Sequence, residues 1–229
     1  MRVELVGKFR HEYKIPVCFE DYYTIRRRLE VVTMKDSHVK EDGWYYIRSL
    51  YFDNFDNKVL LEKVNGINVR EKFRLRYYNE DCRFVRLEKK SKIRGLCEKK
   101  SVSLTKEECE KICTGEMDFL MEKKEALLWE FYAKTKYQQL KPKTIVEYKR
   151  EPYIDGPGNV RVTFDTEIKT GIYDTHFFKR NPCVETNPGE ILMEVKYDAF
   201  LPAVIQDIIQ TNTRHAQAFS KYARSRIYG

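Results

Sequence analysis

Segments with one apolar face and one charged face recur along this chain. Strand periodicity in REKFRLRYY, residues 70–78, puts alternate side chains on opposite faces. The charged face then carries Arg70, Lys72, Arg74 and Arg76, and the apolar face carries Phe73, Leu75 and Tyr77. FRHEYKI, FVRLEKKSK, NVRVTFDTEI and ILMEVKYD repeat the pattern. The alternation therefore predicts an amphipathic sheet with mixed charges on one side.

The same periodicity locates the secondary structure. The expected strands cover residues 8–15, 45–53, 68–78, 82–92, 97–103, 143–153, 159–169 and 190–197. Helices are expected at 19–33, 105–114, 117–138 and 202–227 (the last as one helix or two), with a short turn near 55–64. Thr105 and Glu108 have the spacing of a capping box, and Gly115 is placed to end that helix.

These elements predict an α+β fold. The tripeptide NED between two strands has hairpin length, which favours antiparallel pairing. Eight strands with helices outside them suggest a closed or nearly closed antiparallel barrel. No repeat or Pro/Gly-rich linker divides the sequence, so we predict one domain over residues 1–229. Alternation does not say which face is inside, and an ordinary sheet with one wet face is the competing interpretation.

Composition and charge limit the kinds of partner that this protein is expected to bind. The chain has 229 residues, 42% of them hydrophobic, and a net charge of +8. A basic excess favours an anionic partner, and phosphate, nucleic acid and acidic lipid all qualify. The sequence shows neither a signal-peptide pattern nor the roughly 20 apolar residues that span a bilayer, so we expect a soluble, cytoplasmic protein. Six scattered cysteines without a CxxC pair are expected to be free thiols.

An inward-facing charged surface would have to be wet and occupied. A buried, unpaired ion costs several kcal/mol, so such charges must pair with one another or with a ligand. Cations outnumber anions on these faces, which indicates a polyanionic ligand. The glutamates Glu12, Glu88 and Glu194 would repel that ligand unless they pair with lysines or hold a hard cation. Oxygen ligands suit Mg²⁺ or Mn²⁺.

An ordered set of short motifs runs through nearly the whole chain. The set is HEYK, SLYFDN, REKFRLRYY, LEKKSK, EKKSV, EYKREPY, VRVTFDTEI, LMEVKY and FSKYARSR. In this order and spacing the sequence resembles the polyphosphate polymerase domain of the vacuolar transporter chaperone (VTC) family, within the CYTH-like triphosphate tunnel metalloenzymes. The resemblance implies an eight-stranded antiparallel β-barrel tunnel with helices packed outside. Its lumen would be lined by basic residues and a few glutamates, which would put the charged face inside.

The resemblance also implies roles for individual residues. Those matching the family's catalytic positions are Arg74, Arg76, Lys90, Arg150, Arg161 and Lys196. Those matching its substrate-binding positions are Lys14, Lys100, Ser220 and Lys221, with Lys99 replacing Lys100 if the alignment shifts by one residue. Glu194 matches the metal-binding glutamate, and Glu12 is its expected companion. The wider superfamily opens with ExExK, whereas Arg10 replaces the first glutamate here, which weakens the case for a two-metal hydrolase.

The resemblance implies an ATP–polyphosphate phosphotransferase that uses Mn²⁺ or Mg²⁺. Its partners would be ATP or another nucleoside triphosphate and inorganic polyphosphate or triphosphate, with pyrophosphate or phosphate also possible. A membrane-protein partner stays open. A triphosphatase or tripolyphosphatase of the same fold, and a non-catalytic polyphosphate-binding module, are the alternatives. Nucleic acid is not expected, because Phe73 and Tyr77 face away from the arginines instead of forming a stacking platform beside them.

Overall fold

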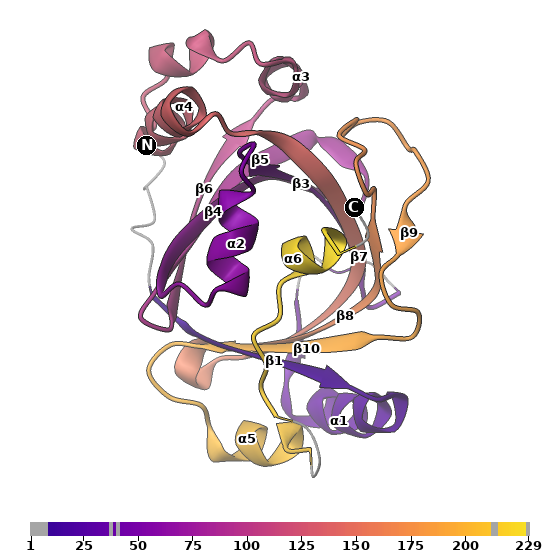
Figure 1. Cartoon of the computed structure of the whole chain (residues 1–229). Coiled ribbons are helices and arrows are strands. Elements are labelled where there is room, and N and C mark those ends of the chain that lie inside the picture. The colour runs from indigo at the N-terminus through magenta and orange to yellow at the C-terminus, as the bar shows by residue number, and fades with distance from the viewer. Residues whose placement is uncertain (1–8, 37–38, 40–41, 212–214, 228–229) are drawn as a thin grey trace.

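A single antiparallel sheet curls into a barrel in this computed structural model (Figure 1). The structure describes residues 9–36, 39, 42–211 and 215–227. Eight strands form the sheet in the order β1-β10-β8-β7-β3-β4-β5-β6. They are β1 (His11–Val17), β3 (Tyr45–Asp53), β4 (Val69–Tyr78), β5 (Asp81–Ile93), β6 (Leu96–Leu104), β7 (Lys141–Asp155), β8 (Val160–Thr170) and β10 (Ile191–Tyr197). Two-residue strands β2 (Met34–Lys35) and β9 (Val184–Glu185) pair with β7 and β8.

Among the described residues, the eighth side of the barrel has no ladder. Each of the other seven neighbouring pairs is an antiparallel ladder, such as β1 with β10, where Lys14 lies opposite Glu194. The registers of β3–β7, β4–β5 and β7–β8 each contain a shift. Between β6 and β1 a single isolated bridge joins Arg10 and Cys97, whose backbone groups exchange hydrogen bonds of 2.9 and 3.0 Å. The sheet is therefore a curled, nearly closed barrel, and the predicted α+β fold with eight principal antiparallel strands is confirmed.

Local sequence explains the β4–β5 hairpin and the third helix. Asn79 and Glu80 both have positive φ, as a two-residue turn of the hairpin type requires, and Asn tolerates that conformation well. Helix α3 (Lys106–Thr114) begins with the predicted capping box, in which Thr105 and Glu108 satisfy each other's backbone N–H groups. Gly115 ends the helix in the left-handed conformation, also as predicted.

Helices cover the outside of the barrel in two groups and flank its opening (Figure 1). Helix α3, α4 (Ala126–Gln138) and the 3₁₀ helix η1 (Asp118–Glu122) lie at one side, and α1 (Phe19–Val32) and α5 (Ala203–Ile209) at the opposite side. Helices α2 (Lys58–Val64) and α6 (Lys221–Ser225) lie in front of the opening, and the short η2 (Pro157–Asn159) precedes β8.

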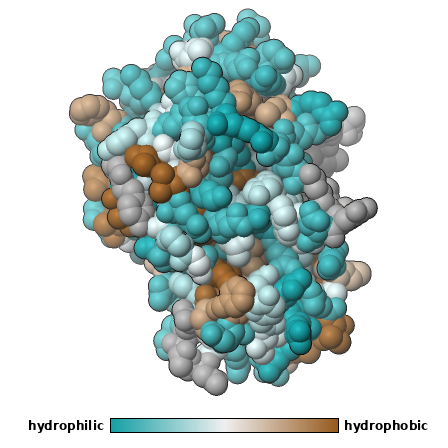
Figure 2. Space-filling view, turned by 90° about the vertical axis from the view of Figure 1, so that its right-hand side faces the viewer, coloured by the Kyte–Doolittle hydropathy of each residue, from teal (hydrophilic) through white to brown (hydrophobic). Residues whose placement is uncertain are grey.

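The apolar strand faces pack outward beneath these helices. Phe73 and Leu75 of β4 are buried, and the Phe73 ring lies 5.1 Å from the Phe131 ring of α4. On the opposite side, Val162 and Val195 pack with Leu29 of α1. The surface in Figure 2 is mostly hydrophilic, with small separate apolar patches. The charged strand faces therefore point into the barrel, which the alternation alone left open.

Two helix predictions need correction. Residues 117–138 were expected to form one helix, but η1 and α4 are separated at Lys123–Glu125, where Lys123 and Glu125 are extended. The Trp129 indole N–H donates to the Lys123 carbonyl at 2.7 Å and stabilises this break. The segment 202–227 does contain two helices, but the described residues between α5 and α6 are not helical, and residues 212–214 lie outside the described ones. Residue 8 of the expected first strand and the ends of the predicted domain, 1–8 and 228–229, also lie outside them.

Candidate phosphate-binding tunnel

A cavity of about 240 Å³ lies inside the barrel. Among the described residues, eleven lysines and arginines line it, against three glutamates. The cations are Arg10, Lys14, Lys72, Arg74, Arg76, Lys90, Lys99, Arg150, Arg161, Lys196 and Lys221, and the anions are Glu12, Glu98 and Glu194. A smaller cavity of about 100 Å³ adjoins it beneath α2 and α6 and shares Lys14, Lys72 and Lys90. Such an excess of one sign strongly favours a polyanionic occupant.

The two arginines of β4 are positioned by one buried carboxylate. Glu88 of β5 has no exposed surface and receives Arg74 Nε at 2.8 Å and Arg74 Nη2 at 2.7 Å. Arg76 Nη1 lies 3.7 Å from the same carboxylate, and Lys99 Nζ lies 3.0 Å from it. Burial alone would raise the pKa of Glu88, but these three cations outweigh it and hold the pKa well below its usual range. Glu88 is therefore a permanent anion that orients both guanidinium forks.

Two tyrosine hydroxyls complete this arrangement. Arg74 Nη1 donates to the Tyr51 hydroxyl at 2.9 Å, and Arg76 Nη2 donates to the Tyr148 hydroxyl at 3.0 Å. Burial would raise the pKa of Tyr51, but the adjacent Arg74 and Lys72 charges lower it to about 7. Both forks are thus fixed before any ligand is bound.

A second cluster surrounds Glu194 of β10. Lys221 Nζ lies 2.8 Å from Glu194 Oε1, Lys14 Nζ lies 3.3 Å from the same oxygen, and Arg150 Nη2 donates to Oε2 at 3.2 Å. Arg150 also makes a bidentate pair with the buried Asp165, with both distances 2.6 Å. Burial opposes ionisation of Glu194, yet Lys14 and Lys221 hold its pKa well below the usual range.

Glu12 of β1 pairs with two further tunnel lysines. Lys90 Nζ lies 2.7 and 2.8 Å from the two carboxylate oxygens, and Lys196 Nζ lies 3.5 Å from Oε1. Burial lowers the pKa of Lys196 to about 8, although Glu194 and Glu12 act in the opposite direction. Glu12 and Lys90 also lie on β1 and β5, so their contact helps to close the seam near Cys97.

Arg161 lies nearer the edge of the cavity than Arg74, Arg76 or Arg150. Its Nη2 donates to Asp36 Oδ2 at 2.6 Å and to the Tyr45 hydroxyl at 2.7 Å. Its side chain retains 33% exposure, compared with 8% for Arg150. Arg161 is therefore closer to solvent than Arg150.

Eleven of the twelve residues expected from the sequence line one or both cavities. They are Glu12, Lys14, Arg74, Arg76, Lys90, Arg150, Arg161, Glu194, Lys196, Ser220 and Lys221. Ser220 lines the smaller cavity, where its hydroxyl also caps α6 by accepting from the Ala223 N–H at 3.3 Å. Their shared location agrees with the expected set, but their chemical roles stay predictions.

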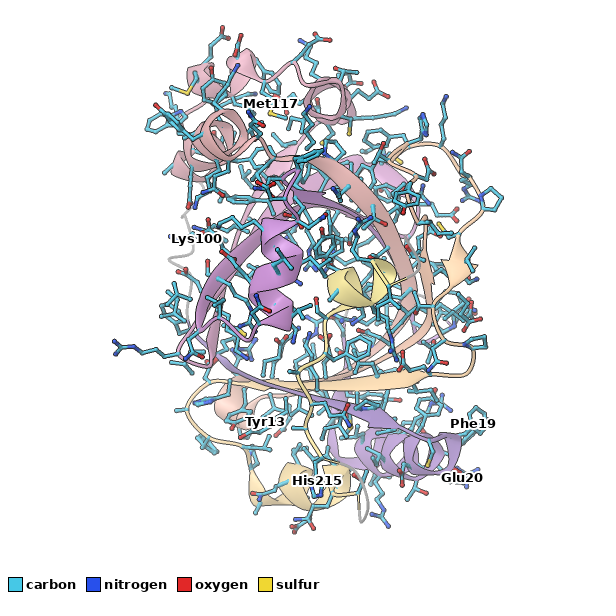
Figure 3. All side chains as sticks on the ribbon, in the orientation of Figure 1. Tyr13, Phe19, Glu20, Lys100, Met117 and His215 are labelled. Carbon is cyan, nitrogen blue, oxygen red and sulfur yellow. The ribbon has the colours of Figure 1, made fainter. Side chains whose placement is uncertain are left out.

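Lys100 is the exception. It pairs in register with Lys89 on the outward face of β5, where Lys89 contacts Glu71 and Glu130. Figure 3 shows Lys100 projecting from the outside of the barrel. Its neighbour Lys99 lines the cavity and reaches Glu88. The expected tunnel position of Lys100 is therefore wrong: period-two alternation gives that position to Lys99.

Sequence reasoning assigned no site role to several lining or supporting residues. Lys72 and Asp165 were on predicted charged faces but matched no family position, and Glu88 was noted only as an anion. Tyr51 and Tyr148 gave no sequence signal, because their importance depends on cross-strand neighbours. Tyr148 lies under several cations, with Lys221 Nζ 4.6 Å from its ring centre.

The carboxylates offer a partial set of metal ligands. Glu12 and Glu194 both line the cavity, and carboxylate oxygens are the chemistry that Mg²⁺ and Mn²⁺ prefer. No group of three or more His, Cys, Asp or Glu side chains suited to a metal occurs among the described residues. The site therefore fits an ion held jointly by one or two carboxylates and by the phosphates of a substrate.

Comparison with solved structures identifies the fold. HpAC1 from Hippeastrum, an adenylyl cyclase candidate with a dominant triphosphatase activity, matches with a TM-score of 0.55, 11% identity, and 95% of each chain covered. An adenylate cyclase candidate from Bacillus halodurans matches with a TM-score of 0.48 and 14% identity, over 83% of this chain and 81% of that one. The barrel is a triphosphate tunnel fold.

A family model identifies the chain more closely. The model of the VTC domain matches residues 9–227, so the chain belongs to the VTC domain family. A search of curated proteins found no significant match. Within the described residues, no helix is both long enough and apolar enough to cross a membrane. The cysteines described are all free thiols, as expected.

Proposed function

We propose that this protein is a polyphosphate polymerase, which transfers the γ-phosphate of ATP or another nucleoside triphosphate to inorganic polyphosphate. One observation carries the proposal: guanidinium forks already held by buried carboxylates line a cationic cavity inside the barrel. Donors fixed in this way need no reorganisation when charge develops on a phosphoryl group. Membership of the VTC domain family supports the polyphosphate substrate.

Four arginines bind the donor triphosphate in this proposal. Arg74 and Arg76 come from β4, Arg150 from β7 and Arg161 from β8, so side chains from three strands contact the phosphates. Each guanidinium still has N–H groups that can turn toward a phosphate, because its carboxylate uses only part of the fork. Lys14, Lys90, Lys196 and Lys221 line the same cavity and neutralise further phosphate charge.

Glu194 and Glu12 are the proposed holders of Mn²⁺ or Mg²⁺. Such an ion would supply positive charge that offsets the charge of the phosphate oxygens. The lysines that now pair with the two glutamates can move to phosphate oxygens, because lysine is a flexible point charge. Exchange of partners would leave the carboxylates available to the ion.

Transfer needs positioning more than covalent chemistry. Phosphoryl transfer proceeds largely by alignment and electrostatic stabilisation, so no protein nucleophile is required. A terminal oxygen of the polyphosphate chain attacks the γ-phosphorus in line, and the nucleoside diphosphate leaves. The arginine forks hold the γ-phosphate while the bond to the β-phosphate breaks.

A product assay tests this function. Purified protein is incubated with ATP labelled at the γ-phosphate and Mn²⁺, and the products are resolved on a gel. A ladder of labelled polyphosphate supports polymerase activity. An Arg150→Ala control should abolish the ladder, because it removes one of the four guanidinium forks and leaves the buried Asp165 with Lys221 as its counter-ion. Unreacted ATP at every enzyme concentration would leave only a polyphosphate-binding role.

Hydrolysis of triphosphate is the second candidate. HpAC1, which shares the fold, has a dominant triphosphatase activity. Water then replaces the chain end as the acceptor, and the same arginines hold the substrate. Free labelled phosphate without a ladder, also in the presence of added polyphosphate, would favour this candidate.

A further inference from the structure

Lys72 differs from the other cations of the tunnel. Among the described residues, every other lysine or arginine lining the main cavity has a carboxylate within ion-pair distance, and Lys72 has none. The Lys72 Nζ lies 3.5 Å from the Ser220 hydroxyl and 5.3 Å from the centre of the Tyr51 ring. A hydroxyl at the limit of hydrogen bonding and a ring face do not neutralise an ammonium group.

The surroundings of Lys72 are themselves cationic. Burial, together with the charges of Lys14, Lys90 and Arg74, lowers the pKa of Lys72 to about 7 against the opposing effect of Tyr51. The fold thus tolerates a lysine whose charged form is poorly stabilised in the absence of a ligand. An anion beside Lys72 would remove that cost.

Lys72 also lies where two cavities meet. Like Lys14 and Lys90, it lines both the main cavity and the smaller cavity beneath α2 and α6, so it lies at their junction. Beyond it, Lys63, Arg70 and Lys92 line the smaller cavity and also a third cavity that opens beside Gly66 and Gly95. A line of basic residues therefore leads from the surface to Lys72, and the donor arginines lie on its other side.

We propose that Lys72 selects the acceptor: it binds the terminal phosphate of the incoming polyphosphate at the junction, and so favours transfer to phosphate over transfer to water. The inference rests on the proposed polymerase function, and it adds the acceptor side of the reaction. Lys72 is a binding residue in this role, because the attacking oxygen belongs to the phosphate it holds.

The two competing reactions balance differently. In transfer, the acceptor oxygen bonds to the γ-phosphorus, the bond between that phosphorus and the β,γ-bridging oxygen breaks, and the diphosphate keeps the electron pair. Fully ionised reactants then give products with the same total charge and release no proton. When water attacks, the products are diphosphate, orthophosphate and one proton. Chain growth and proton release are therefore independent measures of acceptor choice.

The decisive variant is Lys72→Met, which keeps an unbranched side chain one atom shorter than lysine and removes the charge. Loss of a charge-assisted contact to the acceptor is expected to lower the ratio of labelled polymer to labelled orthophosphate about ten- to a hundredfold. Proton release per ATP consumed should rise at alkaline pH. Lys72→Arg should restore most of the ratio. Lys106→Met, on the exposed start of α3, is the matched control and should leave the ratio unchanged.

Stability separates this role from a structural one. Because Lys72 has no carboxylate partner among the described residues, Lys72→Met should melt at the same or a higher temperature than the parent protein without phosphate. A lower ratio together with undiminished stability would support acceptor selection. An unchanged ratio in a folded, active Lys72→Met protein would overturn it.

A binding measurement covers the case in which no polymer forms. The protein is saturated with a non-hydrolysable ATP analogue, and tripolyphosphate is then titrated by calorimetry. Lys72→Met should weaken this second binding about tenfold or more and leave the analogue's affinity within about twofold. If the parent protein makes no polymer but shows this loss, the polymerase function fails and the second anion site stands. Equal tripolyphosphate affinity in parent and variant would refute the site.

Discussion

Glu88→Gln should destabilise the ligand-free protein strongly. The Glu88 carboxylate is fully buried and contacts Arg74 at 2.7 and 2.8 Å, Lys99 at 3.0 Å and Arg76 at 3.7 Å. Glutamine keeps the shape and one acceptor oxygen but leaves the guanidinium groups without their shared anion. Removing one partner of a buried ion pair costs about 3–5 kcal/mol of stability. Because glutamine retains one acceptor oxygen, we expect Glu88→Gln to lose about 3 kcal/mol, the lower end of that range.

Thermal unfolding measures that loss directly. For a chain of this size, each 1 kcal/mol lowers Tm by about 2–4 °C, so Glu88→Gln should melt about 6–12 °C lower in phosphate-free buffer. Tripolyphosphate should then raise the variant's Tm more than the parent's, because two arginines lack a counter-ion. Glu110→Gln is the control: this glutamate is 52% exposed, and its one ion pair within the described ranges is with Lys106, so Tm should barely move. An unchanged Tm for Glu88→Gln would refute the buried counter-ion role.

Three further predictions follow from the tunnel. Lys99→Met should lower kcat/KM about tenfold and Lys100→Met less than twofold, and equal losses in a steady-state assay would contradict the corrected face assignment. Glu194→Gln should reduce turnover about ten- to a hundredfold while polyphosphate binding persists or tightens, and full turnover in saturating Mn²⁺ would exclude the metal role. Without ligand, Tm should rise from pH 7 to 8.5, because Lys72 and Tyr51 have pKa values of about 7 and the folded state therefore holds fewer protons than the unfolded state. Each such proton changes the free energy of unfolding by at most about 1.4 kcal/mol per pH unit. A Tm that calorimetry finds to be independent of pH over this range would argue against the lowered pKa values of Lys72 and Tyr51.

The sequence predicted all eight principal strands and the charged face of five of them, because period-two alternation is strong in those segments. It did not predict which face lies inside, since the pattern is the same for either. The contact between Phe73 and Phe131 decides that point only when the helices are in place. The resemblance to the VTC family anticipated the same answer.

The errors have physical causes. Lys99 and Lys100 are adjacent lysines, and a single-residue shift exchanges their faces, so only the register with Lys90 and Lys89 separates them. The break before α4 depends on a contact of Trp129 with the chain six residues earlier, which helical periodicity does not reveal. Lys72 was visible on its strand, but its lack of a carboxylate partner among the described residues is a property of the assembled barrel.

The pairing of β1 with β10 governs when the barrel can form. Lys14 lies opposite Glu194, so the first strand pairs with a strand about 180 residues later in the chain. At about 5–20 residues per second, ribosomes need roughly 10–35 seconds to synthesise that intervening stretch. Until then β1 lacks its ladder partner, and contacts of such long range also slow folding itself. We therefore expect the barrel to close only after synthesis passes β10, with the nascent chain exposed to chaperones in the interval.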